Sequence, residues 1–408
     1  MTLYEELKWR GLIKDVTSPE LENKLNNEKL TFYIGTDPTA DSMHIGHYSS
    51  FLIAKRLAKA GHKPLLLIGG ATGRIGDPRP TTEREMKSIE EIEKNTKNLK
   101  KQAEEIFGFE VVDNYDWIKN INIIEFLRDY GKYFNINYML DKDIIRRRLE
   151  TGITFTEFSY MLLQSLDFLH LHETRGVNLQ VAGSDQWGNI TSGVDLIRKK
   201  LGDEVYAFTM PLILDQNGKK FGKSEGNALW LDKNKTSSYE LYQYLINTDD
   251  SMIESYLKVF TFLSPEEIMD IVSKHNNEPH LRLGQKTLAR EIITDLHGKE
   301  EYEKAVQISE NLFSGNIKEI NVNDLMIGLK DVPHFILKDE SLLDLLVNND
   351  ICSSKREARE FLGNNAISVN GEIVNDENMF IDKTKTIEGK IVVIRRGKKK
   401  YYVGLVGE

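Results

Sequence analysis

Thr39-Ala-Asp-Ser-Met-His-Ile-Gly-His47 is the stretch that does most to decide the fold of this chain of 408 residues. It follows a short β-like run, residues 30–34, and precedes a segment with the apolar spacing of a helix, residues 49–59. Residues 64–68 are continuously apolar, which is typical of a strand covered on both faces. A charged amphipathic segment at about residues 82–107 predicts a second helix. This order indicates a parallel α/β sheet with ligands at the carboxyl ends of its strands.

The histidines of this stretch indicate a phosphate site. His44 and His47 are three residues apart at the expected start of the helix, so both side chains can face one ligand. Gly46 between them lets a nucleotide approach the backbone, and the free N–H groups of a helix start favour phosphate. Two surface histidines would give the same pattern, so the motif needs support from elsewhere in the chain.

Two further segments supply that support. Gly218-Lys-Lys-Phe-Gly-Lys-Ser224 places two lysines around a glycine, where they can reach a polyphosphate as mobile charges, although many such turns are only solvated. Val181-Ala-Gly-Ser-Asp-Gln-Trp-Gly188 continues a β-like stretch, so Asp185 and Gln186 are expected at the carboxyl end of a strand. A carboxylate there suits ribose hydroxyls and an amide suits a polar substrate group, whereas a simple turn beside a packed tryptophan would bind nothing.

A glycine-rich loop, Gly69-Gly-Ala-Thr-Gly-Arg-Ile-Gly-Asp77, follows the second expected strand. It lacks the Gly-Lys-Ser/Thr ending of a P-loop, and it is not a clean Gly-x-Gly-x-x-Gly that leads into a helix. A P-loop kinase and a dinucleotide-dependent dehydrogenase are therefore disfavoured.

The chain divides into three expected domains. Residues 1–225 form the α/β domain, and residues 226–330 show helical faces without strand signals, which predicts an α-helical domain. Residues 331–340 are the expected linker. Residues 341–408 combine short helices with a hairpin signal at Asn370-Gly371, a pair that suits a type I′ turn, so we expect a small α+β domain there.

Composition and charge fit a globular protein of the cytoplasm. Apolar residues make up 40% and charged residues 29%, and the single cysteine cannot form an internal disulfide. No apolar run approaches the ~20 residues of a membrane span. The net charge is −9, but residues 341–408 hold 11 lysines and arginines against 10 aspartates and glutamates, so overall acidity does not exclude RNA binding.

Together, and in this order, the motifs resemble those of the class I aminoacyl-tRNA synthetases. His44-Ile-Gly-His47 is similar to the HIGH signature of that class, and Lys220-Phe-Gly-Lys-Ser224 to its KMSKS signature. Residues 341–408 resemble the S4 RNA-binding domain of the bacterial tyrosyl-tRNA synthetases, and the resemblance covers nearly the whole chain. Three further segments resemble those enzymes: Tyr33-x-Gly-x-Asp-Pro-Thr-Ala-Asp-Ser42, Gly76-Asp-Pro78 and Gly183-Ser-Asp-Gln-Trp-Gly-Asn189.

The resemblance implies a Rossmann-like catalytic domain, an α-helical anticodon-binding domain and an S4-like domain. It implies a tyrosine–tRNA ligase, which activates L-tyrosine with ATP to tyrosyl-adenylate and pyrophosphate and then transfers tyrosyl to the 3′ end of tRNA(Tyr). ATP with Mg²⁺ is then a substrate, and neither a tightly bound cofactor nor zinc is expected. The implied protein is a cytoplasmic homodimer that binds no membrane.

For tyrosine, the resemblance implies that a hydroxyl and a carboxylate bind the phenol, which both donates and accepts a hydrogen bond. The carboxylate falls on a helix face that also carries two other polar residues, at positions 160 and 164. Without the resemblance, a tyrosine packed in the sheet and an aspartate on a helix surface would be the simpler interpretation. The implied tyrosine-binding residues are Tyr33 and Asp167 for the phenol, Asp77, Tyr160 and Gln164 for the ammonium group, and Gln186 near the reacting carboxylate.

For ATP, catalysis and tRNA, the resemblance implies three further sets. ATP is bound by Gly35, Asp37, His44, His47, Gly183, Asp185, Lys220 and Lys223. The catalytic set is Thr39, His44, His47, Arg84, Lys220, Lys223 and Ser224. The tRNA is bound by Lys355, Arg356, Arg359, Arg395, Arg396 and Lys398, for which a merely solvated basic surface is the alternative.

Two positions depart from the family pattern. Ile34 stands where family members often have a cysteine, so any ribose contact of that side chain is lost. Residues 79–84 replace a loop that commonly begins Ser-Gly-Lys; Arg84 is expected to keep the role of the loop arginine, and Arg79 to replace the loop lysine.

Three other functions fit part of the sequence. A tryptophanyl-tRNA synthetase shares the catalytic fold but normally lacks an S4 tail. A small nucleotidyltransferase of the His-x-Gly-His type would not need the long chain beyond the catalytic part. A non-aminoacylating RNA-binding protein on a synthetase scaffold would not need both signatures intact.

Overall fold

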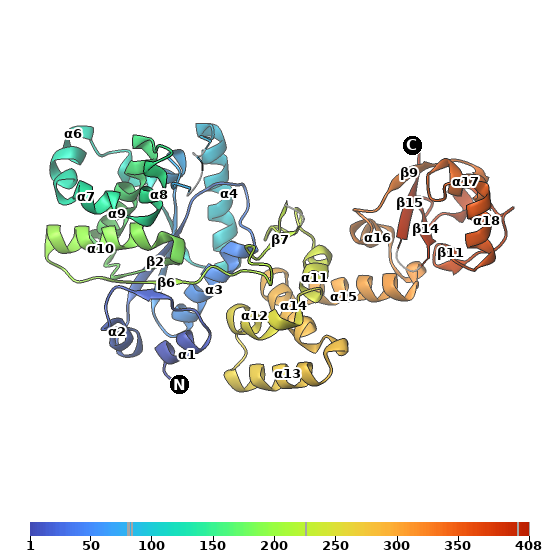
Figure 1. Ribbon diagram of the computed structural model, residues 1–408, viewed down its shortest axis with the longest axis horizontal. Helices are drawn as coiled ribbons and strands as arrows, with labels where there is room; N and C mark the ends of the chain where they lie inside the picture. Colours follow the sequence, from blue (N-terminus) through green and yellow to red (C-terminus); the bar gives the residue numbers. More distant parts are fainter. Residues whose placement is uncertain (80–81, 83–84, 225–226, 398–399, 408) are drawn as a thin grey trace. The chain divides into compact units, whose positions relative to one another are not determined.

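Two compact units make up the chain in the computed structural model (Figure 1), which describes residues 1–79, 82, 85–224, 227–397 and 400–407. The first unit comprises residues 1–235 and 248–291, and the second comprises residues 236–247 and 292–408. The expected helical domain, residues 226–330, is therefore shared between the two units. The boundaries at residues 225 and 330 remain predictions about domain architecture.

A six-stranded sheet forms the centre of the first unit. Its strand order is β1-β6-β5-β2-β3-β4, and all neighbours are parallel except β1, which pairs antiparallel with β6. The expected parallel α/β sheet is confirmed, and the edge strand β1 is too short to leave a pattern in the sequence. The strands are β1 (Asp15–Val16), β2 (Thr31–Thr36), β3 (Lys63–Ile68), β4 (Glu110–Asp113), β5 (Leu179–Gly183) and β6 (Tyr206–Met210).

Helices cover both faces of this sheet, with α3 and α4 on one side and α9 and α10 on the other (Figure 1). Burial on both faces explains why β3 is apolar at successive positions: its last four residues are all buried. The helices are α3 (Ile45–Lys59), α4 (Ile89–Phe107), α9 (Phe155–Arg175) and α10 (Trp187–Leu201).

The sequence pattern predicted that this helix begins near residue 82, but α4 begins at Ile89. Ser88 is its N-cap, because the Ser88 hydroxyl accepts a hydrogen bond from the Glu91 N–H. The predicted end is correct: Gly108 adopts φ +67°, a left-handed conformation that glycine reaches without strain.

Shorter helices complete the first unit. They precede the sheet, connect β4 to α9 and follow β6. They are α1 (Leu3–Trp9), α2 (Leu21–Asn27), α5 (Tyr115–Ile118), α6 (Ile123–Glu125), a π-helical turn (Phe126–Tyr130), α7 (Ile136–Leu140), α8 (Asp143–Leu149), α12 (Ile253–Phe260) and α13 (Pro265–Asn277), and α14 (Leu283–His297) continues into the second unit.

In the second unit, a five-stranded sheet of order β12-β11-β14-β15-β9 packs with helices. Ile391, Val393 and Val403 of this sheet share a core with Leu312 and Leu325 of two helices. The helices are α11 (Ser238–Ile246), α15 (Lys299–Ser314), α16 (Val322–Gly328), α17 (Leu342–Asn348) and α18 (Lys355–Gly363), and the sheet strands are β9 (His334–Leu337), β11 (Ile367–Val369), β12 (Glu372–Ile373), β14 (Ile391–Arg396) and β15 (Lys400–Val406).

The predicted hairpin of this unit is confirmed, and the predicted linker contains structure. Strands β11 and β12 pair antiparallel around Asn370 and Gly371, whose φ angles of +49° and +88° fit a type I′ turn. Residues 331–340, expected to be a linker, contain β9, which pairs in parallel with β15. The proline pattern of this stretch concealed a strand because its pairing partner lies some 70 residues later in the chain.

Candidate active site

The site forms between β2 and β5, where the strand order reverses. From β2 the chain proceeds to β3 and β4 on one side, and β5 and β6 lie on the other side of β2. Tyr33 on β2 lies in the apolar core that α9 and α10 build on their side of the sheet, and its ring packs on Phe168 with 5.5 Å between centroids. Its hydroxyl is buried and has no hydrogen-bond partner among the described residues. Burial, and next the charge of Asp167, raise the pKa of Tyr33 well above its usual value.

Asp167 on α9 is the buried carboxylate of the site, with a side chain of which only 2% is exposed. Asn114 Nδ2 donates to Asp167 Oδ2 at 3.0 Å, and Trp117 Nε1 donates to Oδ1 at 3.0 Å. Burial raises the pKa of Asp167 to about 8, although both donors act to lower it. Without the resemblance, the sequence pattern favoured an aspartate on the helix surface. The burial of Asp167 shows that this interpretation is wrong.

Tyr160 lies on the same helix, nearly two turns before Asp167, and it is also buried. Its hydroxyl donates to Asp37 Oδ2 at 2.9 Å, and Thr72 Oγ1 donates to Asp37 Oδ1 at 2.7 Å. Burial and the nearby carboxylate of Asp37 raise the pKa of Tyr160 well above its usual value. The resemblance assigns Asp37 to ATP, whereas in the structure its carboxylate faces the tyrosine-side residues. Gln164 is half-buried one turn after Tyr160.

The glycine-rich loop after β3 lets the backbone pass close to two carboxylates. A Cβ on Gly69 would lie 2.0 Å from Asp37 Oδ1, and a Cβ on Gly70 would lie 2.2 Å from Asp113 Oδ1. Asn114 accepts from the Ala71 N–H at 2.7 Å, which fixes the loop to the end of β4. These glycines therefore serve close packing around the acidic side chains of the site.

A second polar cluster joins the carboxyl end of β5 to Asp77. Gln186 Nε2 donates to Asp77 Oδ2 at 2.8 Å, and Asn189 Nδ2 donates to Asp77 Oδ1 at 3.1 Å. Asp185 precedes Gln186 in a single 3₁₀ turn and is exposed. A Cβ on Gly183 would lie 2.7 Å from Asp185 Oδ1, so a larger residue there would displace the Asp185 side chain.

The two histidines organise the start of α3. His44 is the N-cap, and its Nδ1 accepts from the Gly46 N–H at 3.1 Å; His47 Nδ1 accepts in return from the His44 N–H at 3.1 Å. Their rings stack at 3.9 Å between centroids. Desolvation and the neighbouring His44 lower the pKa of His47 to about 3, so this imidazole is neutral at pH 7 and can accept the bond from the His44 N–H.

The segment of the second signature lies directly against the first. The Ile45 N–H donates to Leu229 O at 2.9 Å, and the Leu229 N–H donates to Gly222 O at 2.9 Å. Gly222 has φ +86°, and a Cβ there would lie 1.8 Å from Ile45 Cγ2. Phe221 is buried against Tyr256 and Phe260, with ring centroids 4.6 and 4.8 Å apart. Residues more than 170 positions apart in sequence are thus joined by backbone hydrogen bonds and close packing.

Several predicted residues lie outside this geometry. Gly35, Thr39 and Lys220 are exposed. Lys223 and Ser224 form a two-residue strand, β7 (Lys223–Ser224), which pairs with β8 (Asn227–Ala228). Arg84 and Lys398 fall outside the described residues.

Five of the six predicted tRNA-binding residues are described, all in the second unit, and three of these five have acidic partners there. Lys355 pairs with Asp344 at 2.6 Å, Arg359 with Glu377 at 2.5 Å and Arg396 with Glu357 at 3.9 Å. Arg356 is exposed, and the structure records no ion pair for it among the described residues. Arg395 is half-buried on β14.

Sequence reasoning missed four side chains of the site: Asn114, Trp117, Thr72 and Asn189. The first two follow β4 directly, in Asn114-Tyr-Asp-Trp117, and a polar residue at the carboxyl end of a strand was the available signal. Thr72 and Asn189 lie inside segments that the sequence analysis singled out, but roles were assigned there only to neighbouring residues.

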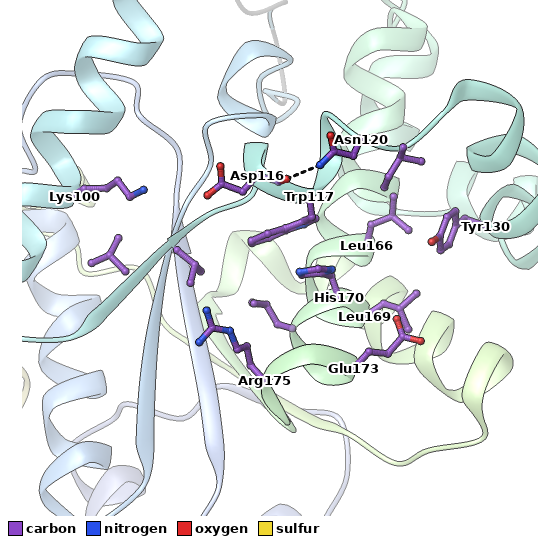
Figure 2. Close-up of a pocket in the computed structure, with 14 residues that line it drawn as sticks. Lys100, Asp116, Trp117, Asn120, Tyr130, Leu166, Leu169, His170, Glu173 and Arg175 are labelled. Carbon is purple, nitrogen blue, oxygen red and sulfur yellow. Dashed lines mark hydrogen bonds between the residues drawn. The ribbon is translucent and has the colours of Figure 1, made fainter.

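A cavity of about 630 Å³ is lined by Trp117 (Figure 2). The Trp117 ring stacks on His170 with 4.5 Å between centroids, and Leu166 and Leu169 of α9 also line the cavity. Figure 2 shows Glu173 and Arg175 at its lower edge. The cavity therefore borders the same helix as Asp167 and shares Trp117 with the site, but Asp167 itself does not line it.

The described residues place no group of three or more His, Cys, Asp or Glu side chains so that it could hold a metal ion. None of the helices in the described part of the chain has the length and apolarity that crossing a membrane requires.

Known proteins share the sequence and the fold of this chain. A family model described as tRNA synthetases class I (W and Y) matches residues 25–314, so the fold and the site define a class I aminoacyl-tRNA synthetase. A model described as the tyrosine–tRNA ligase SYY-like C-terminal domain matches residues 324–404. The tyrosine–tRNA ligase of Listeria monocytogenes serotype 4a (strain HCC23) is 49% identical over 99% of both chains, and that of Macrococcus caseolyticus is 50% identical over 98% of both. The chain belongs to the tyrosine–tRNA ligase family.

Solved structures agree with this placement. A C-terminally truncated mitochondrial tyrosyl-tRNA synthetase of Aspergillus nidulans is 34% identical with a TM-score of 0.67, and the match covers 76% of this chain and 94% of that one. A tryptophanyl-tRNA synthetase of Encephalitozoon cuniculi is 16% identical with a TM-score of 0.55 over 74% of this chain and 87% of that one, which shows a shared fold alone.

Proposed function

We propose that this protein charges tRNA(Tyr) with L-tyrosine, using ATP as its magnesium complex. Tyrosine and ATP first give tyrosyl-adenylate and pyrophosphate. The tyrosyl group then passes to the 3′-terminal ribose of the tRNA, and AMP leaves. Family membership supports the reaction, and the groups around Tyr33 and Asp167 support the choice of amino acid.

The observation that carries the choice of tyrosine is an unpaired hydroxyl beside a buried carboxylate. The Tyr33 hydroxyl has no partner among the described residues, and the Asp167 carboxylate is held by Asn114 and Trp117. A substrate phenol can accept a hydrogen bond from the Tyr33 hydroxyl and donate one to the Asp167 carboxylate. A phenylalanine side chain would leave the buried Tyr33 hydroxyl unpaired and give the Asp167 carboxylate no further donor, and the indole of tryptophan could donate but not accept.

The first step needs no general base. The tyrosine carboxylate is already ionised at neutral pH; it attacks the α-phosphorus of ATP, and the bond to the bridging oxygen breaks as pyrophosphate leaves with its electron pair. Catalysis then consists of holding both reactants in line and stabilising charge on the phosphates. In this proposal Asp77, Tyr160, Gln164 and Gln186 orient the amino acid. Thr39, His44, His47, Lys220, Lys223, Ser224 and Arg84 act on the phosphates, and Gly35, Asp37, Gly183 and Asp185 bind the adenosine.

Amino-acid-dependent exchange of labelled pyrophosphate into ATP tests the function. We expect exchange with tyrosine but not with phenylalanine or tryptophan at the same concentration. We also expect the protein to charge a tRNA(Tyr) transcript with tyrosine. Preference for tryptophan would overturn the phenol assignment, and exchange without charging would confine the protein to adenylate formation.

The second unit is the proposed tRNA anchor, and its ion pairs predict which basic residue matters most. Arg356→Glu in the full chain is expected to weaken tRNA binding about tenfold and to reduce the slope of log affinity against log salt by about one or more. Lys355→Glu is the matched comparison and should have the smaller effect, because Asp344 already compensates that charge. Tyrosine-dependent exchange should not change. Equal tRNA affinity in the Arg356 variant and the wild type would contradict this role.

A homodimer is the proposed assembly, and exposed apolar side chains of the first unit support it. Residues 121–127 divide between core and surface: Ile121 and Phe126 are partly buried and pack against the core of the first unit, whereas the other apolar side chains are exposed. Ile123, Ile124 and Leu127 are 64%, 65% and 54% exposed, and Phe155 at the start of α9 is 73% exposed. Such a surface is typical of an interface. Sedimentation of the active protein as a monomer would contradict the proposal. We place the protein in the cytoplasm, on the strength of its single, buried cysteine.

A further inference from the structure

A buried ion pair ties together three segments beside the site. Arg148 on α8 and Glu157 on α9 have side chains that are 4% and 2% exposed. Arg148 Nη2 donates to Glu157 Oε2 at 2.9 Å, and Nη1 donates to Oε1 at 3.3 Å. The remaining contacts of the guanidinium are to backbone oxygens: Arg79 O at 2.9 Å, Thr82 O at 3.1 Å and Gly152 O at 3.2 Å.

A pair of this kind is not explained by stability alone. Removing two charges from water costs several kcal/mol per ion, and an apolar pair of similar volume is often as stable. The guanidinium has five donors in a rigid plane, which a lysine lacks, so it can join several acceptors in a fixed geometry. The arrangement therefore favours a role in which geometry matters.

The contacts of the pair lie close to the proposed reaction centre along the chain. Glu157 is in the first turn of α9, where Thr154 caps the helix, and Tyr160 follows three residues later. Arg79 comes two residues after Asp77, whose carboxylate Gln186 and Asn189 hold. Asp77 is thus held by the β5 cluster, and the backbone oxygens of Arg79 and Thr82 are held by Arg148.

We propose that Arg148 and Glu157 are positioning residues, which hold the backbone at Arg79 and Thr82 in place relative to α9 for the activation step. This inference rests on the proposed function for its kinetic part. The tyrosine-binding groups have supports of their own. Asn114 and Trp117 donate to Asp167. Tyr160 donates to Asp37, and Asp77 accepts from Gln186 and Asn189, so tyrosine affinity should depend little on the pair. The rate of adenylate formation should depend on it strongly, because small displacements near reacting groups are costly.

The test compares a double variant, Arg148→Met with Glu157→Met, with the wild type. Replacing both partners removes the link to the two carbonyls without leaving an unpaired buried charge. We expect at least a tenfold fall in the rate of tyrosine-dependent exchange at saturating substrates, with the tyrosine Kd within threefold of the wild type. Hydrogen exchange of the peptide that holds Arg79 and Thr82 should become at least tenfold faster, while the exchange of β2 and β5 stays unchanged. Arg148→Lys with Glu157 retained should recover less than half of the rate.

Arg175→Met with Glu110→Met is the matched control. This pair, 2.6 Å apart, also joins α9 to a neighbouring element, but it is partly exposed and touches no loop of the site. We expect wild-type exchange rates and hydrogen exchange from it. Unchanged hydrogen exchange at Arg79 and Thr82 in the Arg148 variant would overturn the proposal, as would a rate loss matched by a general loss of protection. A wild-type protein inactive with every amino acid would refute the proposed function instead, and the hydrogen-exchange comparison would still decide the positioning role.

Discussion

Asp167→Asn is expected to abolish most tyrosine activation, with a loss of about 3 kcal/mol in tyrosine binding, or roughly 100-fold. The carboxylate accepts from Asn114 and Trp117 and has lone pairs left for the substrate phenol. An amide in its place keeps one acceptor oxygen and directs N–H donors at groups that are themselves donors. Equilibrium dialysis with labelled tyrosine and the pyrophosphate-exchange rate measure the effect.

The pH dependence of tyrosine binding supplies a second readout. Burial raises the pKa of Asp167 to about 8, so the carboxyl of the empty site is largely protonated below that pH. A phenol that donates to it favours the ionised form. Wild-type tyrosine affinity is therefore expected to weaken as the pH falls below about 8, and this dependence should be absent from Asp167→Asn.

Asp116→Asn is the control for this substitution. Asp116 lies in the helix that carries Trp117, but its carboxylate is exposed and faces Lys119. It should leave binding and exchange at wild-type values. Full tyrosine activation in the Asp167 variant, with a folded protein by thermal unfolding, would show that the phenol binds elsewhere.

Gly222→Ala is expected to slow adenylate formation about 100-fold, because the two signature segments can no longer lie in contact. The new Cβ would be 1.8 Å from Ile45 Cγ2, and neither group can move freely: Ile45 is buried at the start of α3, and Phe221 is buried in an aromatic cluster. The tyrosine Kd should change less than threefold, since the phenol-binding groups lie on other elements. Single-turnover formation of adenylate separates the rate from the affinity.

Gly218→Ala and a second-site change isolate the cause. Gly218 has φ +76° in the same loop, but a Cβ there would meet nothing within 4 Å, so its replacement costs only the backbone strain of about 1–2 kcal/mol. Its adenylation rate should stay near that of the wild type. Adding Ile45→Ala to Gly222→Ala removes the clashing methyl group and should restore at least part of the rate. Equal slowing by both glycine variants would point to strain and not to the contact.

The predictable part of the site lies within single elements. The strand, turn and helix around His44 follow from apolar spacing and glycine positions, and so do the polar face of α9 and the Asn370-Gly371 turn. These patterns are local because the periods of helices and strands repeat over a few residues. The resemblance then supplied roles for residues, such as Tyr33, that spacing alone would have placed in the core.

Only the tertiary structure decided what those elements do together. It buried Asp167 and gave it Asn114 and Trp117 as donors, and it made Gly222 a point of contact with Ile45. It also assembled the pair of Arg148 and Glu157 under the segment after Asp77. Each of these depends on which faces pack across the sheet or the loop, and such contacts join residues far apart in sequence. The sequence by itself determined the strands and helices around the signatures, their order and the signatures they carry. Short elements such as β1 and β9, and the burial, partners and pKa values of the site residues, were decided by packing, because desolvation and hydrogen bonding depend on what surrounds a group and not on its neighbours in the chain.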